Sequence, residues 1–333
     1  MKIAFIMSSP IISTSNGVLS QAMTWKRGLE ALGNTVLLVS PFEPQTWEEF
    51  DIIHFFVFSE YMADFVESLY KVNENIVLSP ILDTTYSVKQ IALLSKWGHR
   101  KLRLTNKYRR LRDVKSHIKL VLVRSNFEKK YFTDAFDMPE ETVQIAPLSF
   151  GAYKAHEADT KRENYCFHLS FLADDRKNVK RLILAAEKYN FKLKLAGRLR
   201  NEKEKEKINT WLKASNNVEY LGFLSKEDLI NEYSKAKVFA LPSINEGVGL
   251  VALEAASYGC DVVVTNFGGP QEYYGEYAKK VNPLSVNEIG RGIRFFLDGN
   301  TYQPQLKEHI VTNYNLDKTI TRLNDLYLSI IKQ

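Results

Sequence analysis

Two glutamates, Glu246 and Glu254, stand eight positions apart around the start of a predicted helix. Gly247 and Gly249 lie between them and let backbone N–H groups come close to a ligand. A helix N-terminus offers unpaired N–H donors and a positive dipole end, which suits a phosphate or diphosphate. Eight helical residues span at most about 12 Å, close to the distance from a sugar to a ribose across a diphosphate. The spacing indicates a nucleotide-sugar site, with sugar hydroxyls on Glu246 and ribose hydroxyls on Glu254.

The alternative makes Glu246 a solvated turn residue and Glu254 an exposed helix residue. The neighbours of Glu254 argue against it, because residues 251–256 are otherwise apolar or small and a buried carboxylate needs partners. The same segment also reads G-x-G-x-x-A, the dinucleotide fingerprint. That fingerprint requires an acid at the end of the next strand, where this chain has Asn266. We therefore reject it.

The elements that would position this site are short apolar runs that alternate with helical patterns. The first half has predicted strands at residues 2–7, 35–40, 52–57, 76–79, 120–124 and 143–146, and helices at 18–32, 60–72 and 126–135. The second half has predicted strands at 166–172, 191–196, 218–221, 238–241 and 261–265, and helices at 179–189, 202–214, 226–235 and 249–258. Residues 285–333 are predicted to be mainly helical.

This alternation predicts an α/β protein with two doubly wound, Rossmann-like parallel-sheet domains that face each other across a cleft. Ligands would bind beyond the carboxyl ends of the strands. Residues 1–148 form the predicted first domain, and the polar, aperiodic residues 149–165 form the linker. Residues 166–333 form the predicted second domain, whose last helix could pack back on the first.

Residues 241–272, LPSINEGVGLVALEAASYGCDVVVTNFGGPQE, resemble the E-x7-E motif of the retaining GT-B glycosyltransferases, in particular glycosyltransferase family 4. Residues 171–197 resemble the phosphate loop and first helix of that family, and residues 217–243 resemble its nucleobase loop. The first half matches more loosely, through the opening strand and SNGV turn, GLEALGNTV, DIIH and the helix that Ser125 begins. The resemblance covers most of the chain and implies the GT-B architecture.

The resemblance implies a nucleotide-diphosphate-sugar donor bound mainly by the second domain and an acceptor bound mainly by the first. Glu246 would contact the transferred sugar, Glu254 the ribose, and Lys177 the leaving diphosphate. The expected catalytic residues are Asp83, Glu246 and Lys177. The expected donor-binding residues are Gly17, Arg176, Lys177, Phe223, Leu224, Glu246, Gly247, Val248, Gly249, Leu250 and Glu254. No cofactor is expected, and a UDP-sugar is expected rather than a GDP-sugar.

Two positions near the diphosphate depart from the family pattern. Residues 171–172 read Phe-Leu where a Gly-Arg pair usually precedes the phosphate-loop lysine. Arg176 or Arg198 would then have to supply the missing cation. The N-terminal Gly-Gly turn of the family reads Asn-Gly at residues 16–17.

A third departure concerns the anomeric carbon. Residues 82–83 read Leu-Asp where many members carry His or His-Asp after the fourth strand. Asp83 is therefore the candidate polar group there, and a turn or cap role before Thr84 is its alternative. No His/Cys cluster has metal-ligand spacing, and residues 174–176 read Asp-Asp-Arg rather than D-x-D. Metal-free catalysis fits, because cations and a helix dipole can stabilise the leaving group.

Composition sets further bounds. The chain has 333 residues, 45% of them hydrophobic and 25% charged, which suits about two globular domains and excludes a disordered protein. No run approaches the roughly 20 apolar residues of a membrane span. Cys166 and Cys260 are interpreted as reduced core residues, so we expect a cytoplasmic protein. His54 ends an apolar strand and is interpreted as a core residue rather than a catalyst.

The basic residues gather in one segment. Residues 96–119 contain ten Lys or Arg and one Asp, a net charge of +9 against +6 for the whole chain. The segment could be a solvated helix face, a surface for an anionic membrane or lipid diphosphate, or a nucleic-acid site. In the membrane interpretation, an apolar side is contributed by Trp97, Leu102, Leu104 and Tyr108. The protein would then lie peripherally at the inner face of the membrane.

We therefore expect a retaining, metal-independent hexosyltransferase that acts on a glycan or lipid-linked acceptor in cell-envelope polysaccharide or glycolipid synthesis. A GT-B-fold nucleotide-sugar epimerase would use the same donor without an acceptor. A nucleic-acid-binding module is the alternative from another class. It leaves Glu246 and Glu254 unexplained, because carboxylates repel a phosphate backbone, so nucleic acid is not an expected partner. The sequence does not predict the oligomeric state.

Overall fold

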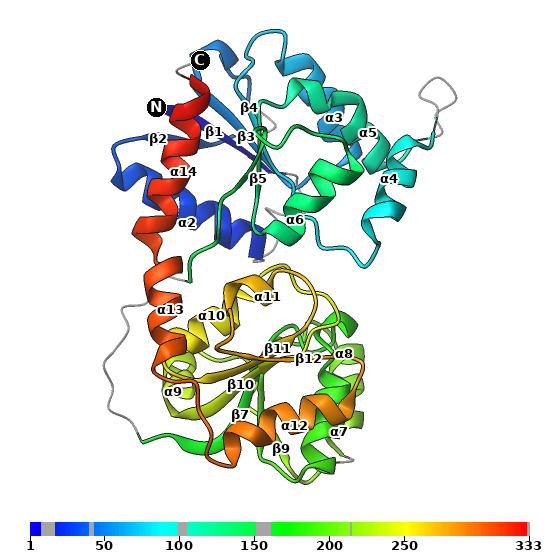
Figure 1. Cartoon of the computed structure of the whole chain (residues 1–333), viewed down its shortest axis with the longest axis vertical. Coiled ribbons are helices and arrows are strands. Elements are labelled where there is room, and N and C mark those ends of the chain that lie inside the picture. Colours follow the sequence, from blue (N-terminus) through cyan, green and yellow to red (C-terminus); the bar gives the residue numbers. More distant parts are fainter. Residues whose placement is uncertain (8–16, 40–42, 99–104, 151–160, 214, 332–333) are drawn as a thin grey trace. The chain divides into compact units, whose positions relative to one another are not determined.

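The computed structural model describes residues 1–7, 17–39, 43–98, 105–150, 161–213 and 215–331. The chain forms two compact units: Met1–Leu148 together with Leu316–Gln333, and Ser149–Asn315. Each unit contains one six-stranded sheet whose described strand pairs are all parallel. Figure 1 shows helices packed around each sheet. The predicted α/β class with two doubly wound parallel sheets is confirmed.

The first unit combines strands from the first half of the chain with helices from both ends. Its strands are β1 (Lys2–Met7), β2 (Thr35–Leu38), β3 (Ile52–Phe56), β4 (Ile76–Ser79), β5 (Leu120–Val123) and β6 (Val143–Ile145). Its α-helices are α2 (Gly17–Ala31), α3 (Glu60–Leu69), α4 (Val88–Lys96), α5 (Lys107–Val114), α6 (Asn126–Lys130) and α14 (Leu316–Ile331). Short 3-10 turns lie at Trp47–Glu49 and Lys115–His117, and a π-helical turn at Tyr131–Ala135 follows α6.

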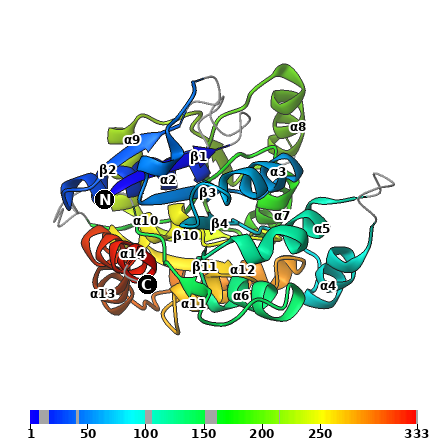
Figure 2. The ribbon, with the colours of Figure 1, turned by 90° about the horizontal axis from the view of Figure 1, so that it is seen from above.

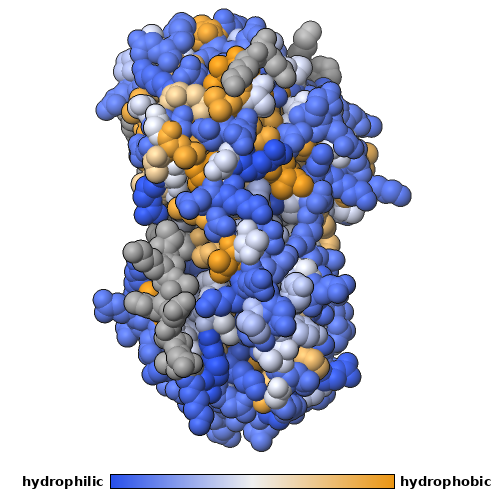
Figure 3. All heavy atoms as spheres, turned by 60° about the vertical axis from the view of Figure 1, so that its left-hand side comes forward, coloured by the Kyte–Doolittle hydropathy of each residue, from blue (hydrophilic) through white to orange (hydrophobic). Residues whose placement is uncertain are grey.

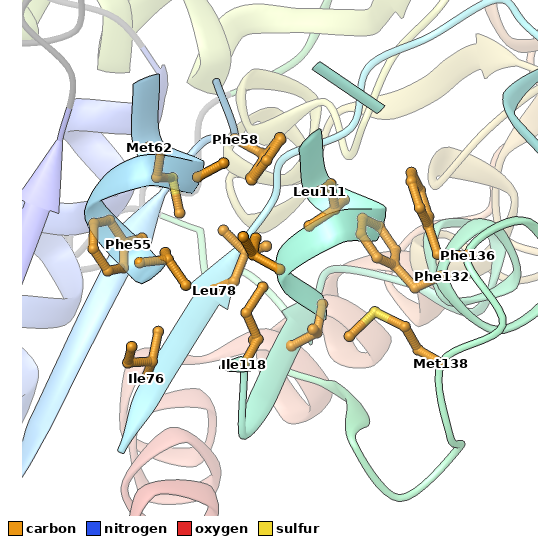
Figure 4. Close-up of a cluster of buried hydrophobic side chains, with 14 of the residues drawn as sticks. Phe55, Phe58, Met62, Ile76, Leu78, Leu111, Ile118, Phe132, Phe136 and Met138 are labelled. Atoms are coloured by element: carbon orange, nitrogen blue, oxygen red, sulfur yellow. The ribbon is translucent and has the colours of Figure 1, made fainter. Parts of the chain in front are cut away.

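The core of the first unit lies against its central strands. The sheet order is β2-β1-β3-β4-β5-β6, and β3, β4 and β5 are buried along their whole lengths. Such strands are continuous apolar runs because helices cover both faces of the sheet. Figure 4 shows part of the resulting cluster, in which Phe55 and Leu78 of the sheet pack with Met62 of α3 and Leu111 of α5. Apolar burial of this kind is the main stabilising contribution to the unit.

The helix α14 completes the first unit from the far end of the sequence. It packs against α2 (Figure 1), where Gly28 leaves the space that Ile320 fills. Buried His54 joins β3 to α14, with its Nδ1 2.6 Å from the Tyr327 hydroxyl and its Nε2 2.8 Å from Ser79 Oγ. Burial lowers the pKa of His54 to about 3, so the ring is neutral. The interpretation of His54 as a core residue is confirmed.

The second unit contains the remaining strands and helices. Its strands are β7 (Glu163–Leu169), β8 (Leu193–Ala196), β9 (Val218–Tyr220), β10 (Ala236–Leu241), β11 (Asp261–Thr265) and β12 (Lys279–Val281). Its α-helices are α7 (Val179–Lys188), α8 (Glu202–Leu212), α9 (Lys226–Lys235), α10 (Leu250–Ser257), α11 (Pro270–Tyr273), α12 (Val286–Leu297) and α13 (Gln305–Tyr314). A 3-10 turn at Asp175–Lys177 precedes α7.

The second sheet has the order β12-β11-β10-β7-β8-β9. The chain enters at β7 in the middle, builds outward to β9, and then crosses to β10 on the other side of β7. The switch point of this doubly wound sheet therefore lies between β7 and β10. β7 begins at Glu163, three residues before the predicted strand, so residues 163–165 belong to the sheet and not to the linker. Residues 151–160 of the predicted linker lie outside the described residues.

Several cations of the basic segment 96–119 bind partners within the first unit. The helices α4 and α5, which carry part of this segment, lie side by side (Figure 2). Buried Arg110 pairs with Asp64, and Arg112 pairs with Asp137 at 2.8 Å. Two lysines of the segment donate hydrogen bonds to uncharged groups. Lys115 Nζ lies 2.6 Å from the Phe136 carbonyl oxygen, and Lys119 Nζ lies 3.0 Å from Asn75 Oδ1. These partners engage part of the charge of the segment within the first unit, and the membrane-surface interpretation stays a prediction. Arg100, Lys101, Leu102, Arg103 and Leu104 lie outside the described residues.

The face shown in Figure 3 is largely hydrophilic, with apolar residues in separate patches. Within the described ranges, no helix has both the length and the apolar character needed to cross a bilayer. The two cysteines, Cys166 and Cys260, are buried and unpaired.

Candidate functional site

The loops after β7 and β10 meet at the switch point of the second sheet. In a doubly wound sheet, ligands bind beyond the strand ends at this point, because the neighbouring connections leave in opposite directions there. The loop after β7 contains the turn Asp175–Lys177 and leads into α7. The loop after β10 carries Glu246 and leads into α10. Two residues predicted to be catalytic thus belong to the two loops that flank the switch point.

Lys177 and Glu246 form an ion pair at this edge of the sheet. Lys177 Nζ lies 2.7 Å from Glu246 Oε2, and the Ser243 hydroxyl donates to the same oxygen at 3.0 Å. The two side chains are 19% and 14% exposed. Their charges therefore interact more strongly than those of a pair on an open surface. Ser243, which is fully buried, has no role in the sequence prediction.

Asn178 fixes the loop that carries the lysine. It is buried in the left-handed conformation with φ of 60°, and its side-chain amide donates to the carbonyls of Pro242 (2.9 Å) and Pro283 (2.6 Å). The Ile244 N–H donates to the Arg176 carbonyl at 2.8 Å. The two loops are thus joined through backbone groups, independently of the ion pair. None of these contacts was predicted.

The helix α10 begins immediately after Gly249. The φ of Gly249 is +80°, a value that glycine adopts without strain. The Tyr274 hydroxyl donates to the Gly249 carbonyl at 2.9 Å, and burial, with the Glu246 carboxylate as a further cause, raises the pKa of Tyr274 well above its usual value. The first N–H groups of a helix lack partners within it, and its dipole end is positive. Of the predicted contacts, Val248 is buried, whereas Gly247 and Leu250 are partly exposed.

The loop after β11 packs against the backbone carbonyl of Glu246. Gly268 has φ of +84°, and a Cβ atom at this position would lie 2.6 Å from the Glu246 carbonyl oxygen. Real Cβ atoms do not come this close to backbone, so only glycine fits. Gly268 therefore helps to set where Glu246 lies, a role that its place in the motif alone did not predict.

Glu254 lies on α10 and is only partly buried. The Tyr233 hydroxyl is 3.4 Å from its Oε2. The neighbouring apolar and small residues Ala252, Leu253, Ala255 and Ala256 are buried as expected. The prediction of a buried acid is therefore only partly correct: Glu254 is partly exposed, while the residues around it form the core face of the helix. Partial exposure is compatible with contact to a ligand.

Phe223 and Leu224 follow β9, at the same edge of the sheet. Phe223 is 69% exposed, and Arg198, which follows β8, stacks with its Cζ 4.7 Å from the ring centroid. Leu224 is partly buried. Arg176, the other candidate for the missing phosphate-loop cation, pairs with Asp174 at 2.7 Å and is itself 59% exposed. Both candidate cations thus lie in loops after strands of the second sheet.

Buried His168 of β7 supports the loop after it. Its Nδ1 lies 2.7 Å from the Ala240 carbonyl, and its Nε2 lies 2.7 Å from Ser170 Oγ. A carbonyl only accepts, so Nδ1 carries the proton and Nε2 accepts from the Ser170 hydroxyl. Burial lowers the pKa of His168 to about 4, the Ala240 carbonyl opposes this, and the Lys177 charge adds to it. The neutral ring thus orients the first residue of the loop.

The two remaining predicted residues belong to the first unit. Asp83 pairs with Arg124, whose Nη2 lies 2.8 Å from Asp83 Oδ1. Buried Glu128 binds Arg124 and also accepts the Leu82 N–H at 2.6 Å, so it supports the turn that carries Asp83. Gly17 is the first residue of α2, and a Cβ atom there would meet nothing within 4 Å. Asn16, the other residue of the Asn-Gly turn, lies outside the described residues.

The acidic, histidine and cysteine residues in the described parts of the chain do not cluster in a way that could hold a metal ion. Lys177 and the start of α10 bring positive charge to the switch point. This arrangement can bind an anion at the α10 start and neutral hydroxyl groups at the carboxylates.

Comparison with known proteins identifies similar glycosyl transferases. Residues 154–313 match the family model of glycosyl transferases group 1. The serotype-specific mannosyltransferase WbdA of Escherichia coli is 34% identical over 93 residues, which are 28% of this chain and 11% of that protein. The chain thus spans only a small part of this curated relative.

Solved structures match the chain over its whole length. Sucrose-phosphate synthase from Thermosynechococcus elongatus has a TM-score of 0.75 at 16% identity, with 100% of both chains covered. Anabaena HepE, solved in complex with UDP and glucose, has a TM-score of 0.73 at 15% identity, with 99% of this chain and 100% of that chain covered. The fold is the GT-B fold, and the predicted resemblance to GT-B glycosyltransferases is confirmed.

Proposed function

We propose that this chain, a GT-B protein whose second unit matches the group 1 glycosyl transferases, transfers a sugar from a nucleotide-diphosphate donor to a glycan or lipid-linked acceptor. The observation that carries the proposal is the Lys177–Glu246 ion pair beside the start of α10, at the switch point of the second sheet. Transfer retains the anomeric configuration and serves cell-envelope polysaccharide or glycolipid synthesis. The name of a further relative, the O-antigen chain mannosyltransferase B of Escherichia coli, supports the polysaccharide role.

The donor diphosphate binds at the start of α10, with the Lys177 ammonium as its counter-charge. Negative charge grows on the diphosphate as the glycosidic bond breaks, so an ammonium and helix N–H groups already in place stabilise the transition state. Glu246 accepts hydrogen bonds from sugar hydroxyls and orients Lys177. Glu254 accepts from the ribose, and Phe223 and Leu224 flank the base. Asp83 of the first unit is a further proposed catalytic group.

We infer that the protein acts in the cytoplasm, where nucleotide sugars are available and thiols stay reduced. Its two buried, unpaired cysteines support this assignment. No separate cofactor is required, since the nucleotide leaves with the reaction as a product.

A nucleotide screen followed by a transfer assay tests the proposal. UDP at 100 times its Kd should stabilise the protein by about 2.7 kcal/mol, measured as a shift in Tm, and GDP should do so less. The protein is then incubated with UDP-sugars, with and without glycan acceptors, and released UDP is measured. Acceptor-dependent release supports the transferase, and ¹H NMR of the product reads the anomeric configuration. Conversion of the sugar without an acceptor would indicate an epimerase, and no nucleotide-dependent shift would contradict the proposal.

Glu254→Ala is expected to weaken nucleotide binding about 10- to 100-fold, because it removes charge-assisted hydrogen bonds worth about 1.5–3 kcal/mol. Calorimetric titration with UDP measures the effect. Glu227→Ala, at an exposed position of α9, is the matched control and should leave UDP binding unchanged. Equal affinities of wild type and Glu254→Ala would remove Glu254 from the site.

Chelation is expected to leave transfer intact. The leaving diphosphate is neutralised by Lys177 and the α10 start, which do not depend on a divalent ion. Transfer rates are compared before and after dialysis against EDTA, and again after Mg²⁺ or Mn²⁺ is added. Loss of turnover that either ion restores would contradict a metal-independent reaction.

A further inference from the structure

The carboxyl ends of β3 and β4 in the first unit enclose a pocket of about 100 Å³. Eight of its eleven lining residues are apolar, among them Phe58, Leu111, Phe132 and Phe136, and the other three are Asp83, Lys107 and Tyr108. Figure 4 labels these four apolar side chains within the buried hydrophobic cluster of the first unit. The pocket therefore has an apolar wall continuous with the core and a few polar groups beside it.

Two strained residues shape this pocket. Val57, which follows β3, has φ of 63°, and Ile81, which follows β4, has φ of 50°. β-branched residues avoid this left-handed region, where glycine would fit without cost. The Val57 N–H donates to the Ser79 carbonyl at 2.8 Å, which holds one strained turn against the neighbouring strand. Both residues line the pocket. The backbone strain is therefore located at the pocket, where local strain often accompanies a functional site.

The polar groups beside the pocket are oriented by the protein. Asp83 is held by Arg124 at 2.8 Å, and its side chain is 35% exposed. Lys107 begins α5, is exposed, and lies with its Nζ 5.1 Å from the Tyr108 ring centroid. A ligand with an apolar end and a polar end would thus meet an apolar cavity and a charged carboxylate next to each other.

We propose that this pocket binds the apolar aglycone of the acceptor, with the sugar hydroxyls of that acceptor directed toward Asp83. The inference rests on the proposed transferase function and specifies its acceptor as a glycoside with an alkyl, isoprenoid or aryl group. A cavity of about 150 Å³ lined by apolar residues binds one benzene molecule. The pocket here has about two thirds of that volume, so it suits about four carbons of such a group. Those carbons would gain apolar contacts in place of water.

A series of α-mannosides that share one sugar and differ in the aglycone tests the proposal. Methyl, butyl, hexyl and phenyl α-D-mannopyranoside are titrated against the full chain by calorimetry. Affinity should rise about fourfold for each methylene added up to the capacity of the pocket and then level off. The phenyl glycoside distinguishes a flat ring from a flexible chain, and tighter binding than the methyl glycoside by either group supports the pocket.

Two variants fill the pocket, and one serves as a control. Leu82→Trp places a large side chain at a partly buried lining position, and Leu111→Phe enlarges a buried one. Both should abolish the difference between hexyl and methyl α-D-mannopyranoside. Leu93→Trp, at a position of α4 that is 69% exposed, should preserve it. If one variant does not fold, the other variant and the wild-type chain-length series still test whether the aglycone binds in the pocket.

The outcomes separate this inference from the function it rests on. Equal affinities across the wild-type series, or a chain-length gain that survives both Leu82→Trp and Leu111→Phe, would overturn the aglycone pocket. UDP binding, measured on the same preparations, tests the proposed donor site of the second unit independently. Chain-length dependence without any UDP binding would leave the pocket standing and contradict the transferase, and UDP binding without chain-length dependence would do the reverse.

Discussion

Lys177→Ala should lower kcat by about 10²- to 10³-fold, the loss seen when one preorganised donor to a developing negative charge is removed. The KM for the nucleotide sugar should change much less, because the charge on the diphosphate grows during bond breaking and the ammonium matters most in the transition state. Initial rates at saturating and subsaturating UDP-sugar separate the two parameters. The magnitude follows from the low exposure of Lys177, 19%, which limits screening by water.

The matched control is Lys180→Ala, on the exposed surface of α7 three positions later. It removes the same charge from the same part of the chain and should leave kcat unchanged. Thermal unfolding of both variants tests whether Glu246, left without its 2.7 Å partner, destabilises the second unit. A Lys177→Ala enzyme with normal kcat and only a raised KM would assign the lysine to ground-state binding instead.

Gly268→Ala should lower kcat/KM about 10²-fold, the cost of displacing a reacting group by roughly 1 Å, although Gly268 itself touches no substrate group in the proposed mechanism. The added methyl group would lie 2.6 Å from the Glu246 carbonyl oxygen. That oxygen is backbone and cannot rotate away, so the Glu246 backbone must shift and take the carboxylate with it. Lys177, bound to that carboxylate, would lose its position as well.

Gly33→Ala supplies the control for backbone strain. Gly33 has φ of +83°, against +84° for Gly268, but a Cβ atom there meets nothing within 4 Å. It should cost about 1–2 kcal/mol of unfolding free energy, the price of a left-handed non-glycine residue, and leave transfer unchanged. Unfolding free energies from denaturant titration and kcat/KM are measured for both variants. Full transfer by Gly268→Ala would show that the close approach to Glu246 is not needed.

The parallel strands were predictable from sequence where they are continuous apolar runs. β4 (Ile76–Ser79) and β11 (Asp261–Thr265) have the predicted bounds, because both are buried along their whole lengths. β12 (Lys279–Val281) was not predicted: it is an edge strand of three residues, two of them lysine, and only Val281 is buried. Pattern reasoning recognises strands through apolar burial, and a short edge strand has little of it.

The site was predictable only in part. Glu246 was predicted from its spacing to Glu254 and from the motif resemblance, and Lys177 from the resemblance alone. Their contact arises because the sheet order brings the ends of β7 and β10 together. Asn178 and Tyr274 were missed, since single polar residues in loops or short helices carry no periodic signal. Counting charges along residues 96–119 overestimated the number of cations that are available at the surface. Arg110 and Arg112 pair with Asp64 and Asp137, which are distant in sequence and therefore outside the count.

The position of α14 has a consequence for how the protein is made. The first unit is discontinuous: it needs residues 316–333 as well as residues 1–148, and Tyr327 of α14 occupies the buried hydrogen-bonding position beside His54. During synthesis, domains usually fold in order from the N-terminus. Here the unit that is made earlier lacks α14, and part of its core stays uncovered, until the ribosome has produced the whole second unit. We therefore expect the nascent chain to complete its second unit first, and its first unit to be the part that exposes apolar surface during synthesis.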